Sequence, residues 1–170
     1  MKHAMPALLA NALLASALLT IATTHAQADV SVKRGEYLSH IMDCGGCHNT
    51  GAFTPKPNLE TPLSGSDIGF EIPGLGVFYP PNLTPDKKTG LGTWTDEQII
   101  AAMTQGKAPD GRELAPVMPW HAFATLTPDD QKAIVAFLRS IPAVSNKVPG
   151  PFGPSEKPTS FILRVVPPQP

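Results

Sequence analysis

The strongest constraint on this chain is a five-residue motif that contains its only two cysteines. Residues 44–48 read Cys-Gly-Gly-Cys-His, and no further cysteine occurs among the 170 residues. On one turn of helix, Cys44 and Cys47 share a face, so their sulfurs can attach to the two vinyl groups of one porphyrin. His48 follows directly and can then ligate the iron. The motif therefore predicts one covalently bound c-type haem.

Three other kinds of site use a Cys-x-x-Cys pair. A thioredoxin-like dithiol usually lies near a βαβ pattern, and no such pattern surrounds Cys44. A structural zinc site needs about four ligands, and the chain has no second cysteine pair. A simple disulfide between Cys44 and Cys47 stays open as an alternative. The motif favours haem attachment over all three.

The N-terminal residues have the features of a secretory signal peptide. Lys2 precedes an Ala/Leu-rich run over residues 7–22, and a small-x-small sequence, Ala-Gln-Ala, ends at residue 28. The run is short and interrupted by polar residues, which favours cleavage over a membrane span. We expect residues 1–28 to be removed and no permanent membrane anchor. Export combined with a haem motif predicts the periplasm of a bacterium.

Composition limits both the fold and the partners. Twenty prolines and 14 glycines predict much loop and little sheet. The net charge is −1 without a basic stripe, which argues against a nucleic-acid partner. The length remaining after the signal peptide suits one domain. We expect this domain over residues 29–148 and a Pro-rich C-terminal extension over residues 149–170.

Three helices are expected. The first runs from about Val32 to Asp43 and leads into the cysteine pair. The second is expected over residues 95–106, because Thr95 and Gln98 form a capping-box pattern. The third is expected over residues 127–142, where a threonine and a proline mark its start and a second proline marks its end.

The remaining chain is expected to be mostly loop. Residues 50–93 contain seven prolines and seven glycines, which excludes a long helix or a regular sheet. At most a short β-hairpin is expected there, from Phe70–Ile72 and Val77–Tyr79. Near the C-terminus, Phe161–Val166 is apolar, and we expect it to pack onto the domain because exposure of such side chains is unfavourable.

The second axial ligand of the iron has two candidates. Met118 lies in the sequence Ala-Pro-Val-Met-Pro-Trp, where two prolines prevent helix and can hold its sulfur at a fixed position. His121 would instead give a bis-histidine haem. Met103 fits the apolar stripe of the second helix and is expected in the core. We favour Met118 and keep His121 as the alternative.

Further segments resemble the class I monohaem cytochromes c. In particular, they resemble the cytochrome c domains and subunits of periplasmic dehydrogenases that act on alcohols, aldehydes or gluconate. The resemblance covers about residues 33–149. Its segments are Gly35–Leu38, the motif at 44–48, Pro81–Asp86, Thr89–Glu97, Pro109–Arg112, Met118–Trp120 and Leu126–Pro142.

The resemblance implies a mostly α fold, the class I cytochrome c fold, with three main helices around one haem and long Pro/Gly-rich loops. It implies that the first and third helices cross, with Gly35 and Tyr37 packed against Phe137 and Leu138.

The resemblance also implies the roles of site residues. It assigns His48 and Met118 as axial ligands and Cys44 and Cys47 as covalent anchors. Three further residues become candidate pocket or propionate contacts, namely Asn82, Trp94 and Arg112. A plain core position is the alternative for Trp94, and a solvated loop position is the alternative for Arg112.

The expected function is one-electron transfer and not catalysis. The resemblance implies a periplasmic carrier that accepts electrons from a dehydrogenase and passes them to a terminal oxidase or another cytochrome. One alternative is a haem subunit bound tightly to one dehydrogenase. Another is an enzyme or gas sensor with an open iron position.

Overall fold

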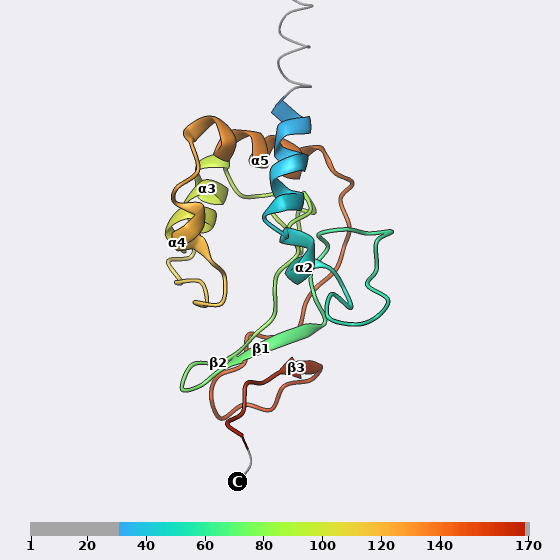
Figure 1. The fold of residues 1–170 in the computed structure, drawn as a ribbon, viewed down its shortest axis with the longest axis vertical. Coiled ribbons are helices and arrows are strands. Elements are labelled where there is room, and N and C mark those ends of the chain that lie inside the picture. Colours follow the sequence, from blue (N-terminus) through green and yellow to red (C-terminus); the bar gives the residue numbers. More distant parts are fainter. Residues whose placement is uncertain (1–30, 169–170) are drawn as a thin grey trace, which may run out of the picture.

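Helices gather at one end of the fold and a small sheet lies at the other (Figure 1). The structure, a computed structural model, describes residues 31–168, so the expected signal peptide lies outside the described residues. In chain order the elements are a helix over residues 31–41 (the N-terminal helix), α2 (Cys44–His48), β1 (Ile68–Ile72), β2 (Gly76–Phe78), α3 (Asp96–Gln105), α4 (Trp120–Phe123), α5 (Pro128–Ser140) and β3 (Phe161–Leu163). A search of residues 31–168 finds no helix with the length and apolar content of a membrane span.

The N-terminal helix crosses α5 in close contact at Gly35. A Cβ atom added to Gly35 would lie 1.9 Å from the carbonyl oxygen of Ala133 and 2.8 Å from Cβ of Phe137. Both distances are far below van der Waals contact, so glycine is what allows the two backbones to approach. The expected crossing of these helices is therefore present at Gly35.

Tyr37 does not take the place expected for it in this crossing. Its side chain is 55% exposed, and the Arg34 guanidinium lies over its ring at 5.6 Å. The next residue, Leu38, is buried and belongs to the same core cluster as Leu138. The prediction for Tyr37 is wrong because the helix turns Leu38 toward α5, and successive helix residues point in different directions.

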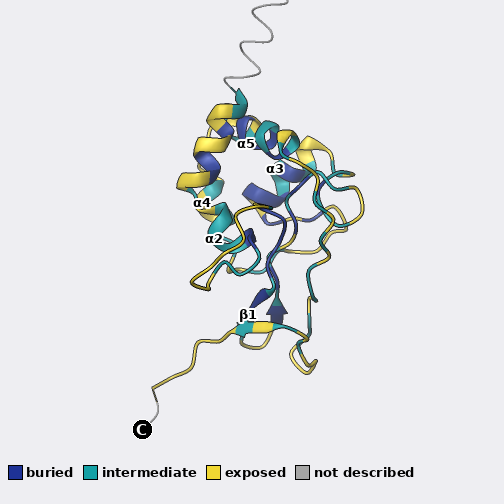
Figure 2. Ribbon diagram, turned by 90° about the vertical axis from the view of Figure 1, so that its right-hand side faces the viewer, coloured by how far each residue is buried: buried dark blue, intermediate teal, exposed yellow. Residues whose placement is uncertain are grey.

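The hydrophobic core lies between the helices. Figure 2 shows buried residues gathered among the helices and along β1. The central cluster consists of Leu38, Leu63, Leu91, Ile99, Met103, Ile134, Val135 and Leu138. Met103 is 8% exposed within this cluster, which confirms the core position expected from its helix stripe.

The start signals of α3 and α5 act as the sequence predicts. The Thr95 hydroxyl accepts a hydrogen bond from the Gln98 amide (3.2 Å), and the Gln98 side chain accepts one from the Thr95 amide (2.9 Å). At α5, the Thr127 hydroxyl accepts from the Asp130 amide (3.2 Å). Such caps satisfy backbone donors that the first helical turn leaves without partners.

The sheet is larger than the hairpin that the sequence predicts. β1 and β2 pair antiparallel, with Phe70 opposite Phe78, as expected apart from shifted ends. β3 then pairs with β1 in parallel, which gives the strand order β2-β1-β3. The limit of one short hairpin is therefore wrong. The third strand comes from far along the chain, and no local pattern near β1 indicates such a partner.

The C-terminal extension packs through its backbone more than through its side chains. β3 joins the sheet, yet Phe161 is 72% exposed and Val165 is 88% exposed. The expected packing of Phe161–Val166 therefore holds for strand pairing, whereas the expected burial of its apolar side chains is wrong. Helices account for 31% of the structure, so loops form its larger part.

Candidate functional site

The motif at 44–48 forms a short helix whose start depends on Asp43. Asp43 has a left-handed backbone (φ 54°), and its side chain accepts a hydrogen bond from the Gly46 amide (3.1 Å). A Cβ atom on Gly46 would lie 2.1 Å from the Asp43 carboxylate. The second glycine of the motif thus leaves room for the carboxylate that caps the helix. The cap places Cys44 and Cys47 one turn apart on α2.

No disulfide joins Cys44 to Cys47. Burial raises the pKa of the Cys44 thiol to about 11. Burial also raises the pKa of Cys47, and the nearby Asp43 charge adds to this rise. Both sulfurs are therefore protonated at neutral pH. A redox-active dithiol relies on a lowered thiol pKa, so this environment does not suit the thioredoxin-like alternative.

His48 is held in one orientation by a backbone carbonyl. The residue is 6% exposed, and Nδ1 of its ring lies 2.8 Å from the carbonyl oxygen of Pro81. A carbonyl can only accept, so Nδ1 carries the proton and donates it. Burial lowers the pKa of His48, which keeps the ring neutral. Nε2 is then the lone-pair nitrogen, as in metal-binding histidines whose other nitrogen is tied.

These donors fit a covalently attached haem. Two protonated thiols lie one helical turn apart, and a neutral imidazole follows them with Nε2 available. Across residues 31–168, no three His, Cys, Asp or Glu side chains cluster as a metal-ion site requires. The zinc alternative therefore has no ligand set in this part of the chain.

Met118 lies in the loop that leads into α4. Its amide donates to the Ala115 carbonyl (3.0 Å), and its carbonyl accepts from the Trp120 amide (2.8 Å). The segment is thus a turn, in agreement with the effect expected of its prolines. His121, the alternative ligand, is exposed on α4 beside the Trp120 ring, with 3.3 Å between ring centroids. His48 ends α2 and Met118 lies two residues before α4, so the two candidate ligands come from separate elements, both labelled in Figure 1.

Asn82 connects two loops with its side-chain amide. Its Nδ2 donates to the carbonyl of Val144 (2.7 Å) and to the hydroxyl of Thr89 (3.0 Å). Its Oδ1 accepts from the amide (2.9 Å) and hydroxyl (2.7 Å) of Thr84. Asn82 is 2% exposed, so these bonds satisfy a buried polar side chain.

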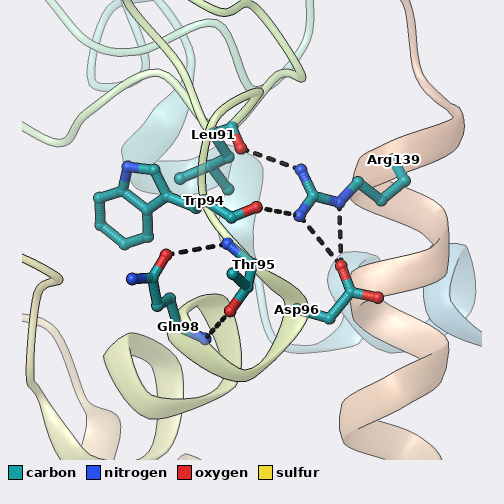
Figure 3. Close-up of polar contacts among 6 residues, drawn as sticks. All are labelled: Leu91, Trp94, Thr95, Asp96, Gln98 and Arg139. Atoms are coloured by element: carbon teal, nitrogen blue, oxygen red, sulfur yellow. Dashed lines mark hydrogen bonds and ion pairs between the residues drawn. The ribbon is translucent and has the colours of Figure 1, made fainter.

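Trp94 precedes α3 and is held through its backbone by Arg139, a residue that the sequence does not single out. From α5, Arg139 donates to the carbonyl oxygens of Leu91 (2.9 Å) and Trp94, and pairs with the Asp96 carboxylate (3.0 Å), as Figure 3 shows. The Trp94 side chain packs against the core cluster. Only the planar guanidinium of arginine can serve these acceptors at once.

Arg112 lies on the surface of the loop before Met118. Its side chain is 57% exposed and pairs with Asp110 at 2.8 Å. The structure thus places it in the solvated loop position that was the alternative for this residue.

The known proteins whose sequences are similar to this chain are cytochromes c, as the haem motif predicts. A family model for cytochrome c matches residues 32–142. The chain is 35% identical over 139 residues to the cytochrome c subunit of alcohol dehydrogenase (quinone) of Gluconobacter oxydans (strain 621H), covering 77% of this chain and 27% of that protein. It is 34% identical over 112 residues to the gluconate 2-dehydrogenase cytochrome c subunit of Pantoea cypripedii, covering 64% and 23%.

A third relative is the fructose dehydrogenase cytochrome subunit of Gluconobacter japonicus, 31% identical over 128 residues, covering 72% of this chain and 25% of that protein. The chain thus spans about a quarter of the length of these relatives. The matched region contains the thiol pair, His48 and Met118. By sequence and by the chemistry of its site, this chain belongs to the cytochrome c family.

Proposed function

We propose that this chain transfers single electrons in the periplasm through one covalent c-type haem. When bound, the haem supplies an iron that alternates between the ferrous and ferric states. Cys44 and Cys47 would hold the group through two thioether bonds. His48 and Met118 are the proposed axial ligands.

The observation that carries this proposal is the hydrogen bond from His48 Nδ1 to Pro81. It fixes the ring and leaves Nε2 as the nitrogen that would bind the iron, one residue after the thiol pair. If Met118 also bound the iron, no position would stay open for a substrate, which would suit electron transfer better than catalysis. Asn82 and Trp94 are proposed as further contacts of the haem pocket, whereas Arg112, paired with Asp110 on the exposed loop, is not.

A direct test replaces both anchors. In a Cys44→Ala, Cys47→Ala variant, haem that survives denaturing electrophoresis should be lost completely, because no thioether remains. The matched control is Ser140→Ala on the exposed end of α5, which should keep the wild-type haem stain. Covalent haem in the double variant would refute the attachment. Rapid carbon monoxide binding by the folded ferrous wild type would instead favour an open iron.

The identity of the partner is a second part of the proposal. Because relatives at 31–35% identity are named as cytochrome subunits of alcohol, gluconate and fructose dehydrogenases, we propose a dehydrogenase as electron donor. The acceptor is proposed to be another cytochrome or a terminal oxidase. The same names also favour the alternative that this chain is a fixed subunit of one dehydrogenase.

The carrier and the subunit differ in how they purify. A carrier should separate from its donor on gel filtration and reduce at a rate that rises with donor concentration. A fixed subunit should stay with the donor at a constant ratio. Gel filtration of the native periplasmic fraction, followed by haem staining of each fraction, distinguishes the two.

A further inference from the structure

After α5, the chain runs beside the two loops that contact His48. Figure 1 shows the chain leaving α5 and passing along the molecule toward the sheet at the far end. Residues 144–148 (the connecting segment) make hydrogen bonds with residues 82–89 and with Ser64 on the way. The cytochrome c family model ends at residue 142, so these contacts come from a part of the chain that the family match does not include.

The first of these loops contains the acceptor of the His48 ring proton, which is the carbonyl of Pro81 (2.8 Å). Asn82, the next residue, donates from Nδ2 to the Val144 carbonyl (2.7 Å). The Thr84 hydroxyl accepts from the Val144 amide (3.1 Å) and donates to Oδ1 of Asn82 (2.7 Å). Both backbone groups of Val144 are therefore paired within three residues of Pro81.

The second loop holds the backbone of His48. The Gly65 amide donates to the His48 carbonyl (2.8 Å). The connecting segment contacts this loop too, because Asn146 donates from Nδ2 to the Ser64 carbonyl (2.9 Å). Val148 packs against the same loop, and a Cβ atom added to Gly65 would lie 2.5 Å from its Cγ1. The connecting segment thus touches both loops that hold His48.

These contacts are buried, and the two loops are joined to each other. Asn82, Thr84 and Ser64 are among the most fully buried side chains of the described residues. The Leu83 amide donates to the Leu63 carbonyl (2.8 Å), which links the loops. A buried polar atom that loses its partner is not rescued by bulk water, so the loss costs more than it does at the surface. Release of the connecting segment is therefore expected to loosen the loops around His48.

We propose that the connecting segment positions His48, with Thr84 and Asn146 as the positioning residues. By holding both loops, the segment keeps the Pro81 carbonyl against the His48 ring. A carbonyl that accepts from Nδ1 makes Nε2 a more basic ligand, and a more basic ligand favours ferric over ferrous iron. This inference rests on the proposed function, because it takes His48 as an iron ligand. It gives residues 144–148 a role in tuning the redox potential.

The first test compares Thr84→Val with Thr84→Ser in the full-length holoprotein. Valine has nearly the shape of threonine but lacks the hydroxyl that pairs with Val144, whereas serine keeps it. In Thr84→Val, the His48 Nδ1 proton should exchange with solvent about tenfold faster, as the loss of one or two net hydrogen bonds implies. The midpoint potential should rise, because the ligand becomes less basic. In Thr84→Ser, both should stay near the wild-type values. NMR of the ferrous form measures the exchange, and a redox titration measures the potential.

A second variant keeps the test decisive where Thr84→Val does not fold. Asn146→Ala removes the bond to Ser64 at a partly buried position, and it should shift both readouts in the same direction. Ser145→Ala, on the exposed neighbour, is the matched control and should change neither. A lower melting temperature with unchanged proton exchange and potential in every folded variant would overturn the positioning role. A ferric wild type without hyperfine-shifted ring protons of His48 would instead refute His48 as a ligand, so the two failures are distinguishable.

Discussion

At the scale of single residues, two neighbours outside the Cys44–His48 motif decide its geometry. Asp43 caps the short helix of the motif, and Pro81 fixes the ring of His48. The sequence alone predicts the haem attachment, because few other kinds of site use two cysteines at this spacing followed directly by histidine. The partners of the motif were not evident, since a backbone carbonyl 33 residues away leaves no mark in the residue types.

The ligand assignment makes a prediction at this scale. Met118→Ala should remove the near-infrared sulfur-to-iron band of the ferric protein and lower the midpoint potential, because a thioether ligand raises the potential. Met103→Leu is the matched control, since Met103 is a core residue and this exchange conserves volume. Loss of the band in His121→Ala, with the band retained in Met118→Ala, would reverse the assignment.

At the scale of elements, α3 and α5 were predictable and β3 was not. Helix starts depend on contacts between residues three positions apart, such as Thr95 with Gln98, so a local pattern contains them. β3 instead depends on β1, and Ser160 and Asp67 lie 93 residues apart. Arg139 is similar, because its acceptors lie more than 40 residues earlier. Long-range pairings of this kind leave no local signal.

The contact between the N-terminal helix and α5 predicts a dependence on pH. Arg34 pairs with Asp130 at 2.8 Å, and this hydrogen bond lowers the pKa of Asp130 below its ordinary value of 3.8. The folded chain therefore binds fewer protons at Asp130 than the unfolded chain does. The stabilisation is present above the unfolded pKa and is lost as pH falls through the folded pKa.

Asp130→Asn should thus lower the melting temperature slightly at pH 7, because the pair is partly solvated. The difference from the wild type should shrink below about pH 4, where protonation removes the carboxylate in both states. Asp129→Asn, on the exposed neighbour, is the control. Melting curves followed by circular dichroism between pH 3 and pH 7 measure the effect. A difference that grows toward low pH would contradict it.

At the scale of the whole molecule, the core among the helices and the outer strand β3 at the sheet end differ in how far their apolar side chains are buried. The core cluster lies among the helices, with Ile134 and Val135 each 2% exposed. In the sheet, Phe161 and Leu163 of β3 are 72% and 44% exposed. Local opening costs least where few apolar contacts are lost, so the two ends should open with different free energies.

Amide hydrogen exchange should reveal this difference. Amides in the second half of α5 should exchange slowest, near the rate of global unfolding. Amides of β3 should exchange at least about tenfold faster, which corresponds to about 1.4 kcal/mol. Exchange measured by NMR on the holoprotein gives both rates. Equal protection at the two ends would mean that sheet and helices open together.

The parallel pairing of β1 with β3 also sets an order of events during folding. The β1–β2 hairpin joins residues close together in the chain and can close early, but the outer edge of β1 has no partner until residues 161–163 reach it. During that interval the folding chain carries an open strand edge, which is where strands of neighbouring chains pair wrongly. Docking of residues 161–163 onto β1 therefore ends the period in which this protein can aggregate through that edge of its sheet.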